Sequence, residues 1–208
     1  MLLKMDLRKL ILLGIEHYWE KTSGVLIEKL NAIVVELLRW KKHINLTGFK
    51  NEESVIKNLV FEALFVLKYL RDRTRIVDAG SGSGIMAFVF ALFLPSEILS
   101  IERNTKKATF QKHIKRLIDI PNLTILNGAI EEIEPLGADA VFAKAFGKTE
   151  AIVKKTDKHL LKMGILLLPK GIKEEPRKLP NYILEKNEAY VLFMGNRQSR
   201  LLIYRKIR

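Results

Sequence analysis

Apolar residues near the start of the chain recur with the period of a helix. Between residues 24 and 43 they lie mostly three or four positions apart, which is the stripe of an amphipathic helix. The residues of this stripe are Leu26, Leu30, Ile33, Val34, Leu37 and Leu38. Similar patterns predict helices over about residues 5–20 and 52–70. We therefore expect residues 1–73 to form a helical extension packed on the rest of the protein.

The pattern changes at Arg75, where short apolar runs begin to alternate with helical segments. Strands are expected at 76–77, 98–101, 123–126, 140–143 and 165–168, and helices at 85–94, 105–118 and 150–161. Such alternation with short connections is typical of a parallel sheet covered on both faces. Two final runs, 190–194 and 201–204, flank a short turn and predict an antiparallel hairpin at one sheet edge. Residues 74–208 thus predict an α/β core with a seven-stranded, mostly parallel sheet.

Composition narrows the classes of protein. Apolar residues make up 48% of the 208 residues, which is enough for a real core. The absence of cysteine excludes a disulfide scaffold, a cysteine zinc site and any reaction that needs a thiolate nucleophile. The longest apolar run, residues 85–94, is too short to span a bilayer, and no signal-peptide cleavage site follows the apolar N-terminal residues. We expect a cytoplasmic protein without a metal or a membrane partner.

Charge is distributed unevenly along the chain. Residues 1–73 carry 13 Lys and Arg against 9 Asp and Glu, a net charge of +4. Residues 74–143 carry 7 against 8, a net charge of −1, and residues 144–208 carry 16 against 6, a net charge of +10. A near-neutral middle beside a basic final third suggests a small-ligand site next to a polyanion-binding face. The alternative is that the lysines only keep the surface soluble.

The sharpest motif is a glycine-rich loop, Asp78-Ala79-Gly80-Ser81-Gly82-Ser83-Gly84, between a strand and a helix. Glycines let the backbone turn tightly and approach a ligand, and the helix that follows offers free N–H groups. A dinucleotide-binding loop would place its third glycine at position 85, which is isoleucine. Gly-x-Gly-x-Gly with an acid two residues ahead instead resembles the first motif of class I methyltransferases, which bind S-adenosylmethionine. The cofactor-binding candidates in this loop are Asp78, Gly80, Ser81, Gly82 and Gly84.

Two further strand ends carry candidates for the same ligand. Glu102 ends the second strand, where a carboxylate can accept hydrogen bonds from both hydroxyls of a ribose. Glu102 taken alone would more often be a solvated strand-end residue. After the third strand, Ala129, Ile130 and Glu131 stand where this fold borders an adenine ring. A helix start with acids near its N-terminus is the alternative for these three residues.

The residues after the fourth strand bear on which atom is methylated. Carbon 5 of a pyrimidine requires a cysteine adduct, and exocyclic amines usually require an Asp/Asn-Pro-Pro-aromatic loop. The chain has Ala143-Lys144-Ala145-Phe146 at that place. Guanine N7 carries a free lone pair and needs no general base. Methylation at N7 therefore requires only that the protein hold the two reactants in line. Lys144 would neutralise a cofactor carboxylate or an RNA phosphate, and Phe146 would stack on an extruded base or simply pack in the core.

Several stretches together resemble the glucose-inhibited division protein B family. They are the glycine loop, the helix end with Trp40-x-x-x-x-Asn45-Leu46-Thr47, Ile101-Glu102 followed by Lys106-Lys107 and Phe110, Ala143-Lys144-Ala145, and Lys170-Gly171. The resemblance implies a bacterial methyltransferase that acts on guanine N7 of 16S rRNA near the decoding centre, with the small ribosomal subunit as partner. It also implies that Gly80, Gly82 and Glu102 hold the cofactor, that residues 129–131 surround adenine, and that position 144 contributes to the active site.

The chain departs from that family at several positions. The family usually has arginine at position 144 and at the place of Ala129, a His-x-x-Asp-Ser element at residues 58–62, and proline and glycine where Met86-Ala87 stand. A point charge does not replace a planar guanidinium neutrally. A catalytically weak or inactive rRNA-binding assembly factor of the same fold is therefore the alternative hypothesis. A methyltransferase acting on a protein or a small molecule is a third one, and nothing in the sequence indicates an oligomeric state.

Overall fold

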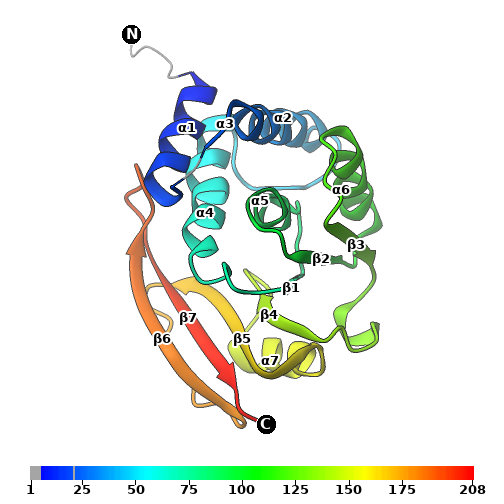
Figure 1. Cartoon of the computed structure of the whole chain (residues 1–208), viewed down its shortest axis with the longest axis vertical. Helices are drawn as coiled ribbons and strands as arrows, with labels where there is room; N and C mark the ends of the chain where they lie inside the picture. The colour runs from blue at the N-terminus through cyan, green and yellow to red at the C-terminus, as the bar shows by residue number, and fades with distance from the viewer. Residues whose placement is uncertain (1–5, 21) are drawn as a thin grey trace.

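The computed structural model describes residues 6–20 and 22–208, and its first third is helical (Figure 1). The helices are α1 (Leu7–Tyr18), α2 (Gly24–Lys41), α3 (Glu52–Val55) and α4 (Phe61–Leu67), with a π-helical turn at Ile56–Val60. The side chains of Asp6 and Ser23 accept hydrogen bonds from backbone N–H groups and cap α1 and α2. Residue 5, where the first predicted helix begins, lies outside the described residues. No helix in the described part of the chain is long and apolar enough to cross a membrane.

The remaining residues form the predicted seven-stranded sheet. Its strands are β1 (Arg75–Ala79), β2 (Glu97–Glu102), β3 (Leu123–Asn127), β4 (Ala138–Phe142), β5 (Leu160–Gly171), β6 (Tyr182–Val191) and β7 (Gln198–Lys206). Their order in the sheet is β3-β2-β1-β4-β5-β7-β6. The first five strands are parallel, and β7 is antiparallel to both β5 and β6. The predicted fold class, including the closing hairpin, is confirmed.

Alternating strand residues face two separate cores. One core joins Ile76, Ile98 and Phe142 to residues of α1, α2, α4, α5 (Ile85–Phe93) and α6 (Thr105–Leu117). The other joins Val77, Val141 and neighbouring strand residues to α7 (Thr149–Thr156) and a 3-10 turn at Ile130–Glu132. Figure 1 shows this asymmetry, with most helices on one side of the sheet and α7 on the other. Because one core contains residues from both sides of position 73, the boundary between extension and core stays a prediction.

Three predicted segments differ from the structure. The predicted helix at 52–70 is divided by the π turn, because one extra residue is accommodated there. The predicted helix at 150–161 ends at Thr156, since Leu160 already pairs with Ala138 as the start of β5. β6 begins at Tyr182 rather than at residue 190. Its charged middle hides the strand pattern, as is common in an edge strand that is exposed on one side.

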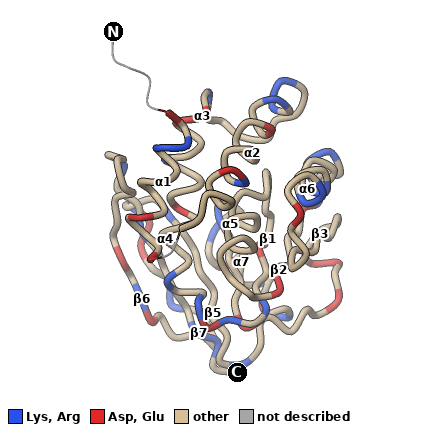
Figure 2. The backbone as a smooth tube through the Cα atoms, turned by 45° about the horizontal axis from the view of Figure 1, so that its top comes forward, with Lys and Arg blue, Asp and Glu red and all other residues tan. Residues whose placement is uncertain are grey.

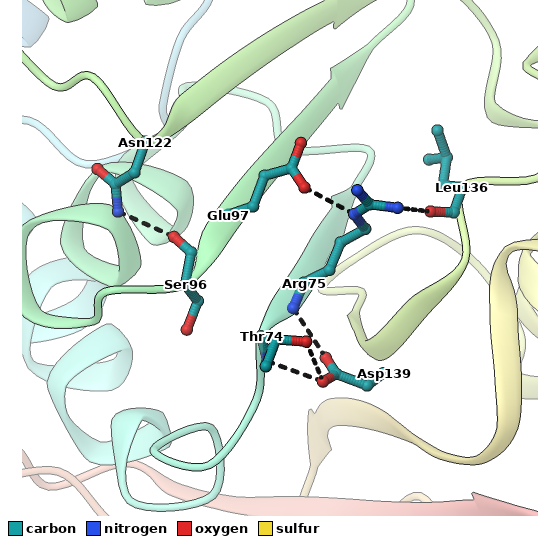
Figure 3. A network of polar contacts seen from close by, with 7 residues as sticks. All are labelled: Thr74, Arg75, Ser96, Glu97, Asn122, Leu136 and Asp139. Carbon is teal, nitrogen blue, oxygen red and sulfur yellow. Dashed lines mark hydrogen bonds and ion pairs between the residues drawn. The ribbon is translucent and has the colours of Figure 1, made fainter.

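Polar contacts fix the amino ends of the parallel strands (Figure 3). The Asp139 carboxylate accepts hydrogen bonds from the backbone N–H groups of Thr74 and Arg75 at 2.8 and 3.1 Å. The Arg75 guanidinium donates to Glu97 at 2.7 Å and to the carbonyl of Leu136 at 3.1 Å. These contacts join β1, β2 and β4 at one end. The carboxyl ends of the same strands, where open α/β sheets bind ligands, are thereby held in register.

Candidate active site

Three neighbouring cavities open at the carboxyl ends of the parallel strands. The Glu102 cavity has a volume of about 340 Å³ and is lined by Gly80, Gly82, Glu102, Arg103, Lys107, residues 128–131, Phe146 and Lys155. The Asp78 cavity has a volume of about 280 Å³ and is lined by Asp78, residues 80–83, Thr47, Met86, Lys107 and Lys144. The hairpin cavity has a volume of about 380 Å³ and is lined by Phe49, Lys57, Asn58, Glu62, Lys144, Lys170 and Arg197. Ala145 lines all three, so the cavities adjoin one another at this residue.

The glycine loop adopts a backbone that other residues rarely tolerate. Gly80, Gly82 and Gly84 have φ angles of 69°, 60° and 79°. A Cβ atom at Gly80 would collide with the Phe146 ring, whereas one at Gly82 would meet nothing within 4 Å. A Cβ atom at Gly84 would lie 2.8 Å from the Gln111 side chain. Gly80 and Gly82 thus face cavities, while Gly84 turns the chain into α5 against Gln111.

Buried polar side chains hold this loop in place. The Gln111 amide donates to Ser81 Oγ at 2.8 Å and to the Gly82 carbonyl at 3.0 Å. Its own carbonyl accepts from Ser100 Oγ at 2.6 Å. The Ser81 N–H donates to the carbonyl of Ile101 at 3.0 Å. Ser81 therefore ties the loop to β2 and also lines the Asp78 cavity.

Glu102 lies at the end of β2 with only 7% of its surface exposed. One carboxylate oxygen accepts from the Gly82 N–H at 2.9 Å, and the other accepts from the Asn104 N–H at 2.7 Å. A carboxylate has about four lone-pair sites, so two of them stay free for a ligand in the Glu102 cavity. Glu102 thus orders the glycine loop and remains able to accept hydrogen bonds from ribose hydroxyls.

Asp78 is almost fully buried at the end of β1, and its Oδ2 has no hydrogen-bond partner in the described part of the chain. Burial raises the pKa of Asp78 from its usual 3.8 to about 7, with a smaller contribution from the Glu102 carboxylate. An unpartnered carboxyl oxygen is costly to bury. Because Asp78 lines a cavity, a ligand with a hydrogen-bond donor or positive charge would satisfy it there.

The predicted adenine-binding residues line the Glu102 cavity together. Ile130 is 2% exposed, and its carbonyl accepts from His159 Nε2 at 2.9 Å. The Glu131 carboxylate pairs with Lys155 at 3.0 Å. Its own backbone N–H and then the Lys155 ammonium lower the pKa of Glu131. Glu131 is therefore charged at neutral pH, and its role toward an adenine amino group stays a prediction.

Lys144 and Phe146 follow β4 but lie on different sides of Ala145. Lys144 lines both the Asp78 cavity and the hairpin cavity, and its ammonium pairs with the Glu62 carboxylate. The Phe146 ring lines the Glu102 cavity and packs over Gly80, with the Lys155 ammonium 5.3 Å from its centroid. Phe146 thus lies beside the cofactor candidates rather than in the hairpin cavity. Its stacking on an extruded base stays a prediction that this position does not favour.

The hairpin cavity is closed on one side by the turn between β6 and β7. The first helix holds this turn, because His17 stacks on Phe193 with centroids 4.4 Å apart and Tyr18 Oη accepts from the Phe193 N–H at 2.7 Å. Arg197, from the same turn, lines the cavity. Among the described residues no carboxylate lies within ion-pair distance of Arg197, whereas Lys170 pairs with Glu174 at 2.9 Å. The N-terminal helices therefore build part of the site.

Comparison with known proteins identifies the family. The family model GidB, described as rRNA small subunit methyltransferase G, matches residues 26–200. The chain belongs to this family. The resemblance read from the Asn-Leu-Thr element, the glycine loop and the Ala143-Lys144-Ala145 element is thereby confirmed.

Relatives of the rRNA small subunit methyltransferase G family agree with this assignment. A protein of that name from Methylobacillus flagellatus is 30% identical over 160 residues, which cover 76% of this chain and 78% of the relative. One from Azoarcus is 32% identical over 141 residues, covering 67% of this chain and 66% of the relative. One from Bordetella petrii is 28% identical, with 59% of its length covered. The chain thus spans about two thirds or less of some of these relatives.

Solved structures show the same fold. A putative O-methyltransferase from Klebsiella pneumoniae superposes with a TM-score of 0.63 at 12% identity, covering 96% of this chain and 97% of that chain. The TYW2 protein of M. jannaschii, solved in complex with AdoMet, superposes with a TM-score of 0.56 at 17% identity, covering 71% of this chain and 74% of that chain. At these identities the similarity shows the Rossmann-like methyltransferase fold alone.

In this family member, several site residues are absent from the sequence-based candidates. Gln111 supports the glycine loop, Glu62 pairs with Lys144, and Tyr190 donates to Glu62 at 2.7 Å. Gln111 could have been found as a polar residue on the otherwise apolar stripe of α6. Glu62 gives a similar signal, since every other residue of α4 is apolar. In the part of the chain that the structure describes, no three His, Asp or Glu side chains are grouped to hold a metal ion.

Proposed function

We propose that this protein transfers a methyl group from S-adenosylmethionine to N7 of a guanine in 16S rRNA, near the decoding centre. The family name and the names of its relatives support a substrate in small-subunit rRNA. The observation that carries the proposal is that the three cavities adjoin at Ala145, which lines all of them, while Lys144 lines the Asp78 cavity and the hairpin cavity. A cofactor site and an acceptor site must adjoin for direct transfer, and these cavities do.

The residues present fit the cofactor. The unpartnered Asp78 Oδ2 suits an ammonium group, and the two free lone-pair sites of Glu102 suit ribose hydroxyls. Gly80 and Gly82 leave room for close backbone approach, and Ala129, Ile130 and Glu131 border the same space. When bound, S-adenosylmethionine supplies an electrophilic methyl group on a positively charged sulfur. Gly84 and Ser81 would act indirectly, by shaping the loop.

The acceptor would occupy the hairpin cavity. Guanine N7 has an in-plane lone pair and no proton, so no general base is needed and the protein has to align the reactants and exclude water. The cavity volume of about 380 Å³ accommodates a nucleobase. Arg197 supplies positive charge there for the RNA backbone, and Lys57 and Lys170, each paired with a glutamate, line the same cavity.

The partner in this proposal is the small ribosomal subunit or its rRNA. The net charge of +10 in residues 144–208 agrees with a polyanion, and Figure 2 shows Lys and Arg on α6 and around β5 and β7. Because ribosomes are cytoplasmic, the same proposal places the reaction in the cytoplasm.

The test is methyl transfer from radiolabelled S-adenosylmethionine to small subunits that lack the modification, with the site mapped by cleavage chemistry specific for 7-methylguanine. One signal near the decoding centre is the expected result. Cofactor binding measured by calorimetry without any transfer would instead favour another substrate or a binding-only role. Transfer to another nucleotide would retain the reaction and correct the substrate.

A further inference from the structure

Glu62 is a buried carboxylate that the sequence-based candidates do not include. It lies on α4, where its six neighbours in the helix are apolar and buried, and it is itself 5% exposed. The π-helical turn at Ile56–Val60 directly precedes this helix. A carboxylate in such a place is costly unless it is paired and hydrogen-bonded. Its partners therefore indicate what it does.

Both oxygens of Glu62 are engaged, and each partner comes from a distant part of the chain. Oε2 pairs with the Lys144 ammonium in the loop after β4. Oε1 accepts from Tyr190 Oη at 2.7 Å on β6. Burial and then the Glu62 carboxylate raise the pKa of Tyr190, so the phenol keeps its proton and acts as the donor. The carboxylate is thus held by Tyr190 on one side and faces Lys144 on the other.

We propose that Glu62, held by Tyr190, is a positioning residue that fixes the Lys144 ammonium between the Asp78 cavity and the hairpin cavity and compensates its charge there. Lys144 lines both cavities, and its side chain is 32% exposed, whereas that of Glu62 is 6% exposed. The pair therefore presents the ammonium to the region where donor and acceptor would meet. This inference rests on the proposed methyl transfer.

The charge of Lys144 has to be compensated because methyl transfer moves a positive charge from the cofactor sulfur to the purine. The guanine N7 lone pair forms the new N–CH₃ bond while the S–CH₃ bond breaks and its electrons stay on sulfur, so the purine becomes cationic and no proton is transferred. An unpaired ammonium beside the purine would oppose that new positive charge electrostatically, and most strongly where water is excluded. The Glu62–Lys144 pair has no net charge. Lys144 can therefore donate a hydrogen bond at the junction without disfavouring the product.

The kinetic experiment compares Glu62→Gln, Lys144→Met and the double variant with the wild type on unmodified small subunits. We expect Glu62→Gln to lower kcat about tenfold or more with a cofactor Kd within about threefold of wild type. In the Lys144→Met background we expect the further decrease from Glu62→Gln to be below about twofold, because the two residues act as one unit. Glu62→Asp should restore part of the activity. A wild-type kcat in Glu62→Gln would overturn the proposal. So would a double variant whose decrease in kcat equals the product of the decreases in the two single variants.

A second readout does not need activity. Acetylation of Lys144 by acetic anhydride, followed by peptide mass spectrometry with Lys162 as internal reference, reports how firmly the ammonium is paired. Glu62→Gln should raise the relative rate severalfold, and an unchanged rate would overturn the pairing. If wild-type protein methylates no RNA, the proposed function fails while this measurement still decides whether Glu62 holds Lys144.

The chain contains a matched control in Glu188. It too pairs with a lysine, Lys68 at 3.2 Å, and accepts from a tyrosine, Tyr69, but it lines none of the three cavities. Glu188→Gln removes the same chemistry on a more exposed surface. We expect it to leave kcat and the acetylation of Lys144 unchanged. A purely structural role for Glu62 would give both variants the same profile, with a lower melting temperature and an unaltered kcat.

Discussion

The charge of Asp78 controls both the stability of the site and its ability to bind a cation. Burial raises its pKa from 3.8 to about 7, so the folded protein retains this proton over a pH range in which the unfolded chain has released it. The stability contributed by the neutral acid is therefore complete below about pH 4 and is lost as the pH rises through about 7. Above that pH the buried carboxylate weakens the empty protein and at the same time attracts an ammonium group.

Asp78→Asn should remove this pH dependence, because the amide resembles the neutral acid and does not ionise. We expect the melting temperature of the wild type, relative to that of Asp78→Asn, to fall by several degrees between pH 5 and pH 8. Scanning calorimetry of both proteins in the absence of cofactor measures the difference, in which all other titrating groups cancel. Parallel curves for the two proteins would show that Asp78 titrates outside this range.

A substitution at Gly80 tests the conformation of the glycine loop, because alanine adds only a Cβ atom there. Alanine at this position would need a positive φ of 69° and would push its Cβ into the Phe146 ring. We predict that Gly80→Ala weakens cofactor binding by about tenfold or more, measured by calorimetry, since the loop or the ring must move. Gly48→Ala is the control, because its Cβ would meet nothing within 4 Å and its φ is not positive. Equal affinity in the two variants would contradict this account of the loop.

At the scale of the elements, Asp139 fixes the amino ends of the strands. Its carboxylate accepts three hydrogen bonds, from the Thr74 N–H, the Thr74 hydroxyl and the Arg75 N–H (Figure 3). We expect Asp139→Ala to lower the free energy of unfolding by about 1–3 kcal/mol, because two backbone donors are deprived of their acceptor. Urea denaturation measures this decrease, and the cofactor Kd should stay near the wild-type value because the cofactor candidates lie at the opposite end of the strands.

The control for Asp139 is Asp72→Ala, an exposed carboxylate in the turn before β1. Substitutions at such surface positions usually change stability by no more than about 0.5 kcal/mol. If both variants are destabilised equally, the network in Figure 3 contributes nothing specific. If Asp139→Ala abolishes cofactor binding without unfolding, the two ends of the sheet are coupled more strongly than the hydrogen bonds indicate.

The helices and strands also show which features of the fold could be predicted from the sequence. Apolar periodicity and the glycine loop predicted the sheet, the hairpin and the cofactor candidates, because both signals are local in the chain. The π turn before Phe61 was missed, since one extra residue in a helical turn leaves the apolar pattern almost unchanged. The pairing of Glu62 with Lys144 and Tyr190 was missed for another reason. It joins residues more than 80 positions apart, and only the packed fold brings them together.

At the scale of the whole molecule, positive charge and an open cavity coincide at the hairpin. Three of the cavity's cations already have carboxylate partners: Lys57 pairs with Glu53 at 2.7 Å, Lys170 with Glu174 at 2.9 Å, and Lys144 with Glu62. Arg197 stands apart from them, since no carboxylate of the described residues lies within ion-pair distance. A guanidinium that is free of internal partners can bind an RNA phosphate without first breaking an ion pair.

Arg197→Gln therefore tests whether RNA binds at the hairpin cavity or responds only to the net charge of the protein. Removing one cation that neutralises a phosphate should reduce the slope of log K against log salt concentration by about 0.7–0.9. We expect Arg197→Gln to weaken binding to small subunits, to reduce the slope by this amount, and to leave the cofactor Kd unchanged. Filter binding at a series of salt concentrations measures the slope.

The control for Arg197 is Lys162→Gln. It removes the same unit charge near the start of β5, at the end of that strand far from Gly171, and should leave the slope unaltered. An equal decrease for both variants would mean that RNA responds to the net charge of the protein, and an unchanged slope for Arg197→Gln would exclude a phosphate contact at the hairpin turn.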